Sequence, residues 1–193
     1  QLHSLHGGDA EAIKARRSIL KNLITAKLKK NSPERFRDAG LMIHALADSY
    51  AHTKGELGTP REKAFGKWVG HLFAGDAPDT IANKTTFPKY EQYVRDLFDA
   101  FSPDSSADGK RKLDQYIAAL RTHVGDAQAM TLEILEQSKN LSRFDQSRFD
   151  LMVKDSSLKL QPIEVQSVMD QMKRTITATS VPTILSSHSS DRH

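Results

Sequence analysis

Apolar residues recur along most of the chain at the spacing of one helix face, and alternating strand-like patterns are scarce. The pattern predicts a first helix from Asp9, a suitable N-cap, to about Lys30. Ser32 and Pro33 predict the cap and first turn of a second helix that runs to about Thr53. Further helices are predicted around 65–72, 88–101, 109–123, 127–140, 144–154 and 162–177. We therefore expect an all-α fold, a compact domain of seven or eight helices.

The expected domain spans 1–180 and is followed by a serine-rich tail at 181–193. Candidate chemistry is confined to about 1–100, so 101–180 is interpreted as a supporting half. The two helices between 109 and 140 are expected to pack against the pair of helices that carries the candidate metal ligands. Their predicted core residues are Leu113, Tyr116, Ile117, Leu120, Leu132 and Leu135.

Composition narrows the possible functions. The 193 residues are 38% hydrophobic and 27% charged, and no apolar run reaches the roughly 18 residues of a membrane span. The absence of cysteine excludes disulfides, thiolate metal ligands and cysteine nucleophiles. A net charge of +4 is compatible with an anionic substrate. Because the chain starts at Gln1 with no signal segment, we expect a piece of a longer or processed polypeptide.

Histidine placement is the feature that points to chemistry. His44, Asp48 and His52 stand four residues apart on the second predicted helix, so their side chains form one stripe. An apolar seam through Phe36 and Tyr50 flanks the stripe, which places it at the edge of the core. Zinc accepts neutral imidazole and carboxylate ligands together, so the stripe predicts a metal site. The alternative is a set of hydrogen-bonded surface residues.

Two further segments add possible metal ligands to the same part of the chain. A glycine-rich turn carries His71, Asp76 and Asp79, and His6 precedes two glycines that permit close approach. Taken alone, His71 is more often a core residue than a ligand, and His6 is compatible with a loose terminus. The combination of the stripe with these segments favours a metal.

Other catalytic mechanisms fit the sequence less well than a metal site does. The chain has no G-x-S-x-G, no P-loop, no G-x-G-x-x-G and no H-E-x-x-H motif. The first helix carries five basic residues among its apolar ones, and these are expected to form a solvated face, with a phosphate-steering surface as the alternative. They are Lys14, Arg16, Arg17, Lys21 and Lys27.

The segment from His44 to Thr53 resembles the metal-binding helix of the zinc-dependent phospholipase C and P1/S1 nuclease superfamily. It is most similar to toxin-type domains at the C-termini of Rhs-like and other polymorphic secreted bacterial proteins. Those domains continue with a Gly-His and a Gly-Asp-x-Pro-Asp element, matched by 70–79, and a Tyr-x-x-Tyr-Val element, matched by 90–94. The similarity covers about residues 3–100.

The resemblance implies an all-helical, zinc-dependent phosphoester hydrolase. The enzymes of that superfamily hold three ions and use an N-terminal Trp as a ligand, whereas this chain starts with Gln1 and its His52 follows Asp48 sooner. One or two ions are therefore expected. The implied ligands are His44, Asp48, His52 and His71, with His6 and Asp79 completing the shell. Asp76 or Asp79 is the implied general base.

We therefore expect a phospholipase C-like effector or toxin domain, secreted or delivered into a target cell by a bacterial secretion system, with a cognate immunity protein as a possible partner. Leu72, Phe73 and Phe87 are the candidate apolar rim for a phospholipid. The alternative is a nuclease that uses the basic first helix. An alternative of another class is a non-enzymatic helical interaction domain with a structural metal or none.

Overall fold

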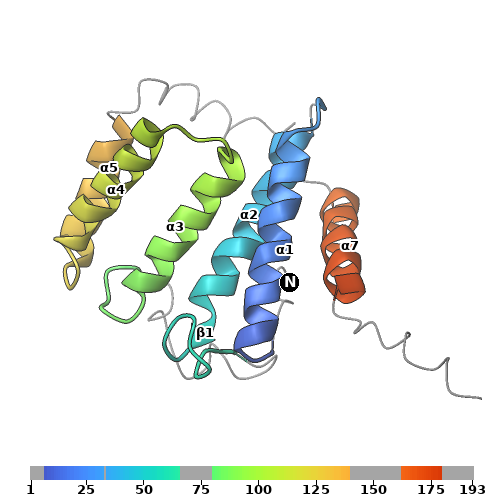
Figure 1. The fold of residues 1–193 in the computed structure, drawn as a ribbon, viewed down its shortest axis with the longest axis horizontal. Helices are drawn as coiled ribbons and strands as arrows, with labels where there is room; N and C mark the ends of the chain where they lie inside the picture. The colour runs from blue at the N-terminus through green and yellow to red at the C-terminus, as the bar shows by residue number, and fades with distance from the viewer. Residues whose placement is uncertain (1–6, 33, 66–79, 140–161, 180–193) are drawn as a thin grey trace, which may run out of the picture.

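The computed structural model of the chain describes residues 7–32, 34–65, 80–139 and 162–179. These ranges contain six helices and one short antiparallel hairpin, so the predicted all-α class is confirmed (Figure 1). The predicted helix at 144–154 lies outside the described residues, as does the one at 65–72 except for Phe65, which is not helical. The elements are α1 (Ala10–Leu28), α2 (Arg35–Ala51), β1 (Thr53–Lys54), β2 (Lys63–Ala64), α3 (Phe87–Phe101), α4 (Ala107–Arg121), α5 (Ala127–Lys139) and α7 (Pro162–Thr179).

Of the two predicted helix N-caps, the structure confirms the one of α1. The Asp9 carboxylate accepts a hydrogen bond from the amide of Ala12 at 3.0 Å, which confirms it as the N-cap of α1. The predicted cap at Ser32 is wrong, because the N-cap of α2 is Glu34, which makes no side-chain capping bond. Ser32 contributes its backbone carbonyl instead, which accepts from the Arg35 amide at 3.2 Å.

Helix α2 ends two residues earlier than predicted because the chain enters a strand. Thr53 pairs with Ala64 and Lys54 with Lys63, which forms the β1–β2 hairpin. The turn between the strands includes Gly55, which has φ = +83°. A Cβ atom at that position would lie 2.2 Å from the carbonyl oxygen of Arg61, so the hairpin requires glycine there.

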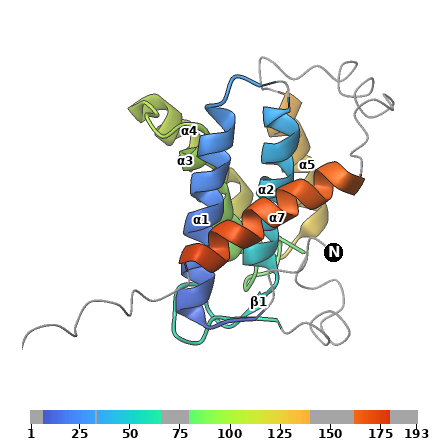
Figure 2. The same ribbon diagram turned by 90° about the vertical axis from the view of Figure 1, so that its right-hand side faces the viewer.

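The main core lies where α1, α2 and α7 meet. Helices α1 and α2 pack along each other, and α7 lies across both of them (Figure 2). Leu20 and Ile24 of α1, Met42 and Leu46 of α2, and Met172 of α7 are almost fully buried in it. Helix α3 packs on α1 and α2 from another side.

A second, smaller core joins α3, α4 and α5 around Phe87, Leu120 and Met130. Ile117 and Leu120 are buried as predicted, and Leu113 and Tyr116 are half-buried. Two predicted core residues of α5 are wrong, because Leu132 is 59% and Leu135 is 52% exposed. Both lie more than about 100° around the helix from Met130, which is the residue that faces the core.

Two further expectations about packing are corrected. Helix α4 packs against α3 and α5, so α3 stands between this pair and α2 (Figure 1). Phe36 of the expected apolar seam is 64% exposed in the first turn of α2, where the Arg35 guanidinium lies 4.6 Å from its ring centroid.

None of the helices in the described ranges has the length and apolar character needed to cross a membrane.

Leucine truncations should separate the main core from the exposed face of α5. Leu46→Ala removes a side chain with no exposed surface and should lower the free energy of unfolding by about 2–5 kcal/mol. Leu132→Ala is the matched control, because its side chain is largely exposed, and it should change that free energy by less than about 0.5 kcal/mol. Urea unfolding followed by circular dichroism measures both. A cost for Leu132→Ala equal to that for Leu46→Ala would contradict this core assignment.

Candidate functional site

Helix α2 brings two of the predicted metal ligands together. His44 Nε2 lies 3.5 Å from Asp48 Oδ2, one helical turn along. The His44 side chain is half exposed, whereas that of Asp48 is mostly covered. Two ligand atoms on one tetrahedral zinc, each bonded at about 2.0–2.1 Å, lie about 3.3–3.4 Å apart. The separation therefore fits a shared ion, and it also fits a histidine–carboxylate ion pair.

His52 stands at the end of the stripe. It is the C-cap of α2, its amide donates to the Asp48 carbonyl at 2.9 Å, and its own carbonyl accepts from Phe65 at 3.1 Å. Its side chain is buried. Within the described ranges no three His, Asp or Glu side chains form a group able to hold an ion. The other predicted site residues lie outside these ranges. They are His6, His71, Asp76 and Asp79.

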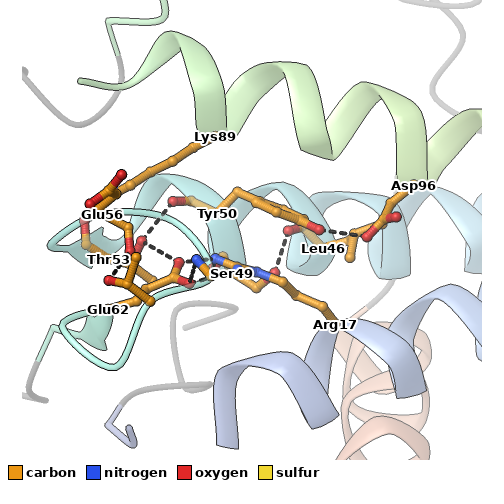
Figure 3. Close-up of polar contacts among 11 residues, drawn as sticks. Arg17, Leu46, Ser49, Tyr50, Thr53, Glu56, Glu62, Lys89 and Asp96 are labelled. Atoms are coloured by element: carbon orange, nitrogen blue, oxygen red, sulfur yellow. Dashed lines mark hydrogen bonds and ion pairs between the residues drawn. The ribbon is translucent and has the colours of Figure 1, made fainter. Parts of the chain in front are cut away.

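A buried ion pair beside this stripe is the main feature that the sequence analysis missed. Arg17 of α1 and Glu62 of the hairpin are 7% and 1% exposed (Figure 3). Arg17 donates to both carboxylate oxygens of Glu62, at 2.6 and 3.2 Å, and to the Ser49 carbonyl of α2 at 2.7 Å. Its guanidinium carbon also lies 3.8 Å from the ring centroid of Tyr50. Arg17 therefore joins α1, the last turns of α2 and the hairpin.

Glu62 fills its remaining acceptor positions within the hairpin. Oε2 accepts from the Gly58 amide at 2.9 Å, and Oε1 accepts from the Thr53 hydroxyl at 3.3 Å. Burial opposes ionisation of the carboxyl, but the hydrogen bonds from Arg17, Gly58 and Thr53 outweigh it, so the pKa of Glu62 lies below its ordinary value. A signal for this pair exists in the sequence, because Arg17 falls on the apolar stripe of α1, four residues after Ile13 and three before Leu20.

The expectation that the five basic residues of α1 form a solvated face is therefore wrong for most of them. Arg16 donates to the Gly7 carbonyl at 2.9 Å, Lys21 lies 3.1 Å from Asp96, and Lys27 lies 2.7 Å from Asp38. Lys14 is the exposed residue of the five. The positive charge of α1 is thus used within the fold, which counts against a phosphate-steering surface on this helix.

Helix α3 is tied to α2 and to β1 by one further polar contact each (Figure 3). The Tyr50 hydroxyl donates to Asp96, and burial together with this bond raises the pKa of Tyr50. Lys89 is 7% exposed, and its ammonium donates to the Thr53 carbonyl at 2.7 Å. Burial lowers the pKa of Lys89. The last turn of α2 and the start of β1 are therefore held by α1 on one side and by α3 on the other.

A groove of about 770 Å³ opens between the hairpin and the start of α3. Three lysines and one glutamate line it, together with apolar side chains. They include Lys54, Glu56, Leu57, Phe65, Lys84 and Lys89. A smaller apolar pocket of about 220 Å³ adjoins the groove and shares Ala51, Thr86 and Lys89 with it. Ala47 and Ala51, which line the smaller pocket, lie next to the His44–Asp48 stripe on α2.

The predicted apolar rim is corrected in one place. Phe87 is 4% exposed and belongs to the second core, so it is not a rim residue. The other two predicted rim residues, Leu72 and Phe73, lie outside the described residues.

Comparisons of the chain with known protein families, with curated proteins and with solved structures find no match.

Removing one partner of the buried ion pair should lower the free energy of unfolding by a large amount. Arg17→Met leaves the Glu62 carboxylate buried without its main counter-charge, and the free energy of unfolding at pH 7 should fall by about 3–5 kcal/mol. Arg17→Met/Glu62→Gln should cost less than Arg17→Met alone, because no charge is left buried and the amide oxygen still accepts from Gly58. Urea unfolding measures both variants.

Arg111→Met is the matched control for this comparison, because it removes a solvent-exposed ion pair with Asp108 and should be close to neutral. If the double variant were less stable than Arg17→Met, the assignment of the cost to an uncompensated buried charge would be wrong.

Acid should destabilise the protein through the same carboxyl. The pKa of Glu62 in the folded chain lies below the ordinary value of about 4.3, so its contribution to stability is fully present above that pH and is lost as the pH falls through the folded pKa. The Asp38 pKa, lowered by Lys27 and Arg37 against the opposing effect of burial, acts in the same direction. The thermal unfolding temperature of wild type should thus fall steeply below about pH 4.

Arg17→Met/Glu62→Gln should lose less stability than wild type between neutral pH and pH 3, because it no longer carries the Glu62 contribution. Parallel pH profiles for the two proteins would contradict the assignment to Glu62.

Proposed function

We propose that the chain is a metal-dependent phosphoester hydrolase of the phospholipase C-like type, which uses one or two zinc ions. The observation that carries the proposal is the His44–Asp48 pair, with Nε2 and Oδ2 3.5 Å apart, on the helix whose last residue, Ala51, lines the groove with its lysines. The role of a secreted effector with an immunity partner belongs to the same proposal.

The donor chemistry of α2 suits zinc. Imidazole nitrogen and carboxylate oxygen are both common zinc ligands, and their separation here matches two ligands of one ion. His52, His71, His6 and Asp79 are the proposed further ligands, and Asp76 or Asp79 is the proposed general base. When bound, zinc would supply Lewis-acid polarisation of the phosphoester and lower the pKa of the attacking water.

The groove supplies the residues that would hold the substrate. Lys89 and Lys84 offer positive charge to the phosphate oxygens, where negative charge develops during hydrolysis. Because most cations of α1 are paired within the fold, a long basic track for nucleic acid is not formed by that helix. The described residues thus favour a substrate with a single phosphoester group over a polyanion, and the nuclease is the secondary hypothesis.

A purely structural metal is the competing hypothesis of a different class. Structural zinc sites are closed by four protein ligands, whereas catalytic sites keep one position open. The His44 side chain is 52% exposed, which supports a site with access for water and substrate.

Metal content is the direct test. Purified wild type supplied with zinc and then freed of excess metal should retain one or two zinc ions per chain, measured by elemental mass spectrometry. His44→Ala/His52→Ala should lose at least one of them, because ligand removal weakens zinc affinity by more than the roughly 10–100-fold seen for second-shell changes. Hydrolysis of a chromogenic phosphodiester should fall with the metal content.

His123→Ala is the control, because His123 lies 3.7 Å from Glu133 in the α4–α5 region, away from the stripe, and should leave zinc content unchanged. Wild type that retains no zinc after supply would overturn the proposal. Zinc that is bound without any phosphoester hydrolysis would favour the structural hypothesis.

A further inference from the structure

The groove and the adjoining pocket are neighbouring spaces that share the lining residues Lys89, Thr86 and Ala51. The combined space is lined by lysines on the groove side and by tyrosine rings on the pocket side. Of the predicted metal ligands, the three in the described ranges do not line this space. They are His44, Asp48 and His52.

Lys89 is the polar group at the junction. Its side chain is 7% exposed and lines both spaces, and the Thr53 carbonyl is the one acceptor that the described residues provide for its three N–H donors. A buried ammonium with donors to spare is destabilised unless an anion compensates it. The nearby carboxylate Glu62 is already bonded to Arg17, Gly58 and Thr53. Lys89 therefore offers charge and hydrogen bonds to a ligand.

The rest of the groove has the same sign. Lys54 and Lys84 also line it and are exposed, against the one carboxylate of Glu56. The described lining residues thus carry a net positive charge. Because Lys89 is largely shielded from water, its attraction for an anion is stronger than that of an exposed lysine.

The smaller pocket suits an aromatic ring. Tyr50, Tyr90 and Tyr93 line it, and the Tyr93 centroid lies 6.2 Å from that of Tyr50 and 6.4 Å from that of Tyr90. Two of the hydroxyl groups are already engaged, with Asp96 and Tyr116, so the rings rather than the hydroxyls serve the pocket. Its volume of about 220 Å³ exceeds the roughly 150 Å³ that holds benzene in an engineered apolar cavity.

We propose that this space binds a small anion that carries one aromatic ring, with the anionic group at Lys89 and the ring among the three tyrosines. The groove is also the substrate site of the proposed hydrolase, so this inference extends that proposal. Binding of the anion at Lys89 needs no metal, so a titration in the presence of a chelator separates the two tests. Its ligand is recognised by two features at once, a negative charge and a single ring.

Calorimetric titration with phenyl phosphate in chelator-containing buffer tests the proposal. Wild type should bind phenyl phosphate, and should bind inorganic phosphate and phenol each about tenfold or more weakly, because each of these lacks one of the two features. Lys89→Met keeps the apolar stem but removes the charge, and should weaken phenyl phosphate binding by about tenfold or more. Lys110→Met on the exposed face of α4 is the matched control and should bind as wild type does.

A second variant keeps the test independent of Lys89. Ala47→Leu fills the smaller pocket from α2 with a good helix former, and should abolish the preference for phenyl phosphate over inorganic phosphate. Far-UV circular dichroism and thermal unfolding verify that each variant folds. The proposal is overturned if inorganic phosphate or phenol binds as tightly as phenyl phosphate, or if neither Lys89→Met nor Ala47→Leu weakens binding. Loss of zinc binding in His44→Ala/His52→Ala would not bear on it.

Discussion

The buried ion pair of Arg17 and Glu62 is the interaction on which the rest of this end of the molecule depends. Both groups are almost fully removed from water, and such charges are tolerated only when they are paired and hydrogen-bonded. Glu62 meets that requirement with contacts from α1, β1 and the hairpin turn. The hairpin therefore cannot leave α1 without exposing an uncompensated charge, and the pair sets the path of the chain after α2.

Together with two contacts from α3, this pair restrains the end of the helix that carries the stripe. Arg17 bonds to Ser49, Lys89 bonds to Thr53, and Tyr50 bonds to Asp96, so restraints from α1 and α3 meet at the last turn of α2 and the start of β1. His44 and Asp48 lie directly before this turn, on a regular helix and not on a loop. Sites on well-supported helices hold their geometry more closely than sites on loops, because the backbone and the neighbouring rotamers are already restrained.

Local periodicity and caps were sufficient to predict the helical class and most helix positions, and the i,i+4 proximity of His44 and Asp48 followed from helix geometry alone. The Arg17–Glu62 pair was not predicted, because its members are 45 residues apart and only the tertiary fold brings them together. Leu132 was misassigned because α5 is apolar on more than one face. Helix geometry says nothing about whether His6 or Asp79 approaches the stripe, so the full ligand shell remains a prediction.

The distribution of positive charge changes how a net charge of +4 is interpreted. Three cations of α1 are paired with Asp38, Glu62 and Asp96, so they stabilise the fold and contribute little field outside it. The cations that line the groove come instead from the hairpin at Lys54, from the turn before α3 at Lys84 and from α3 at Lys89. Lys89 is held in place by the Thr53 carbonyl before any anion arrives, so binding needs no reorganisation of that charge. The basic helix and the proposed cationic site are therefore separate parts of this molecule, and hydrogen-bonding partners distinguish them.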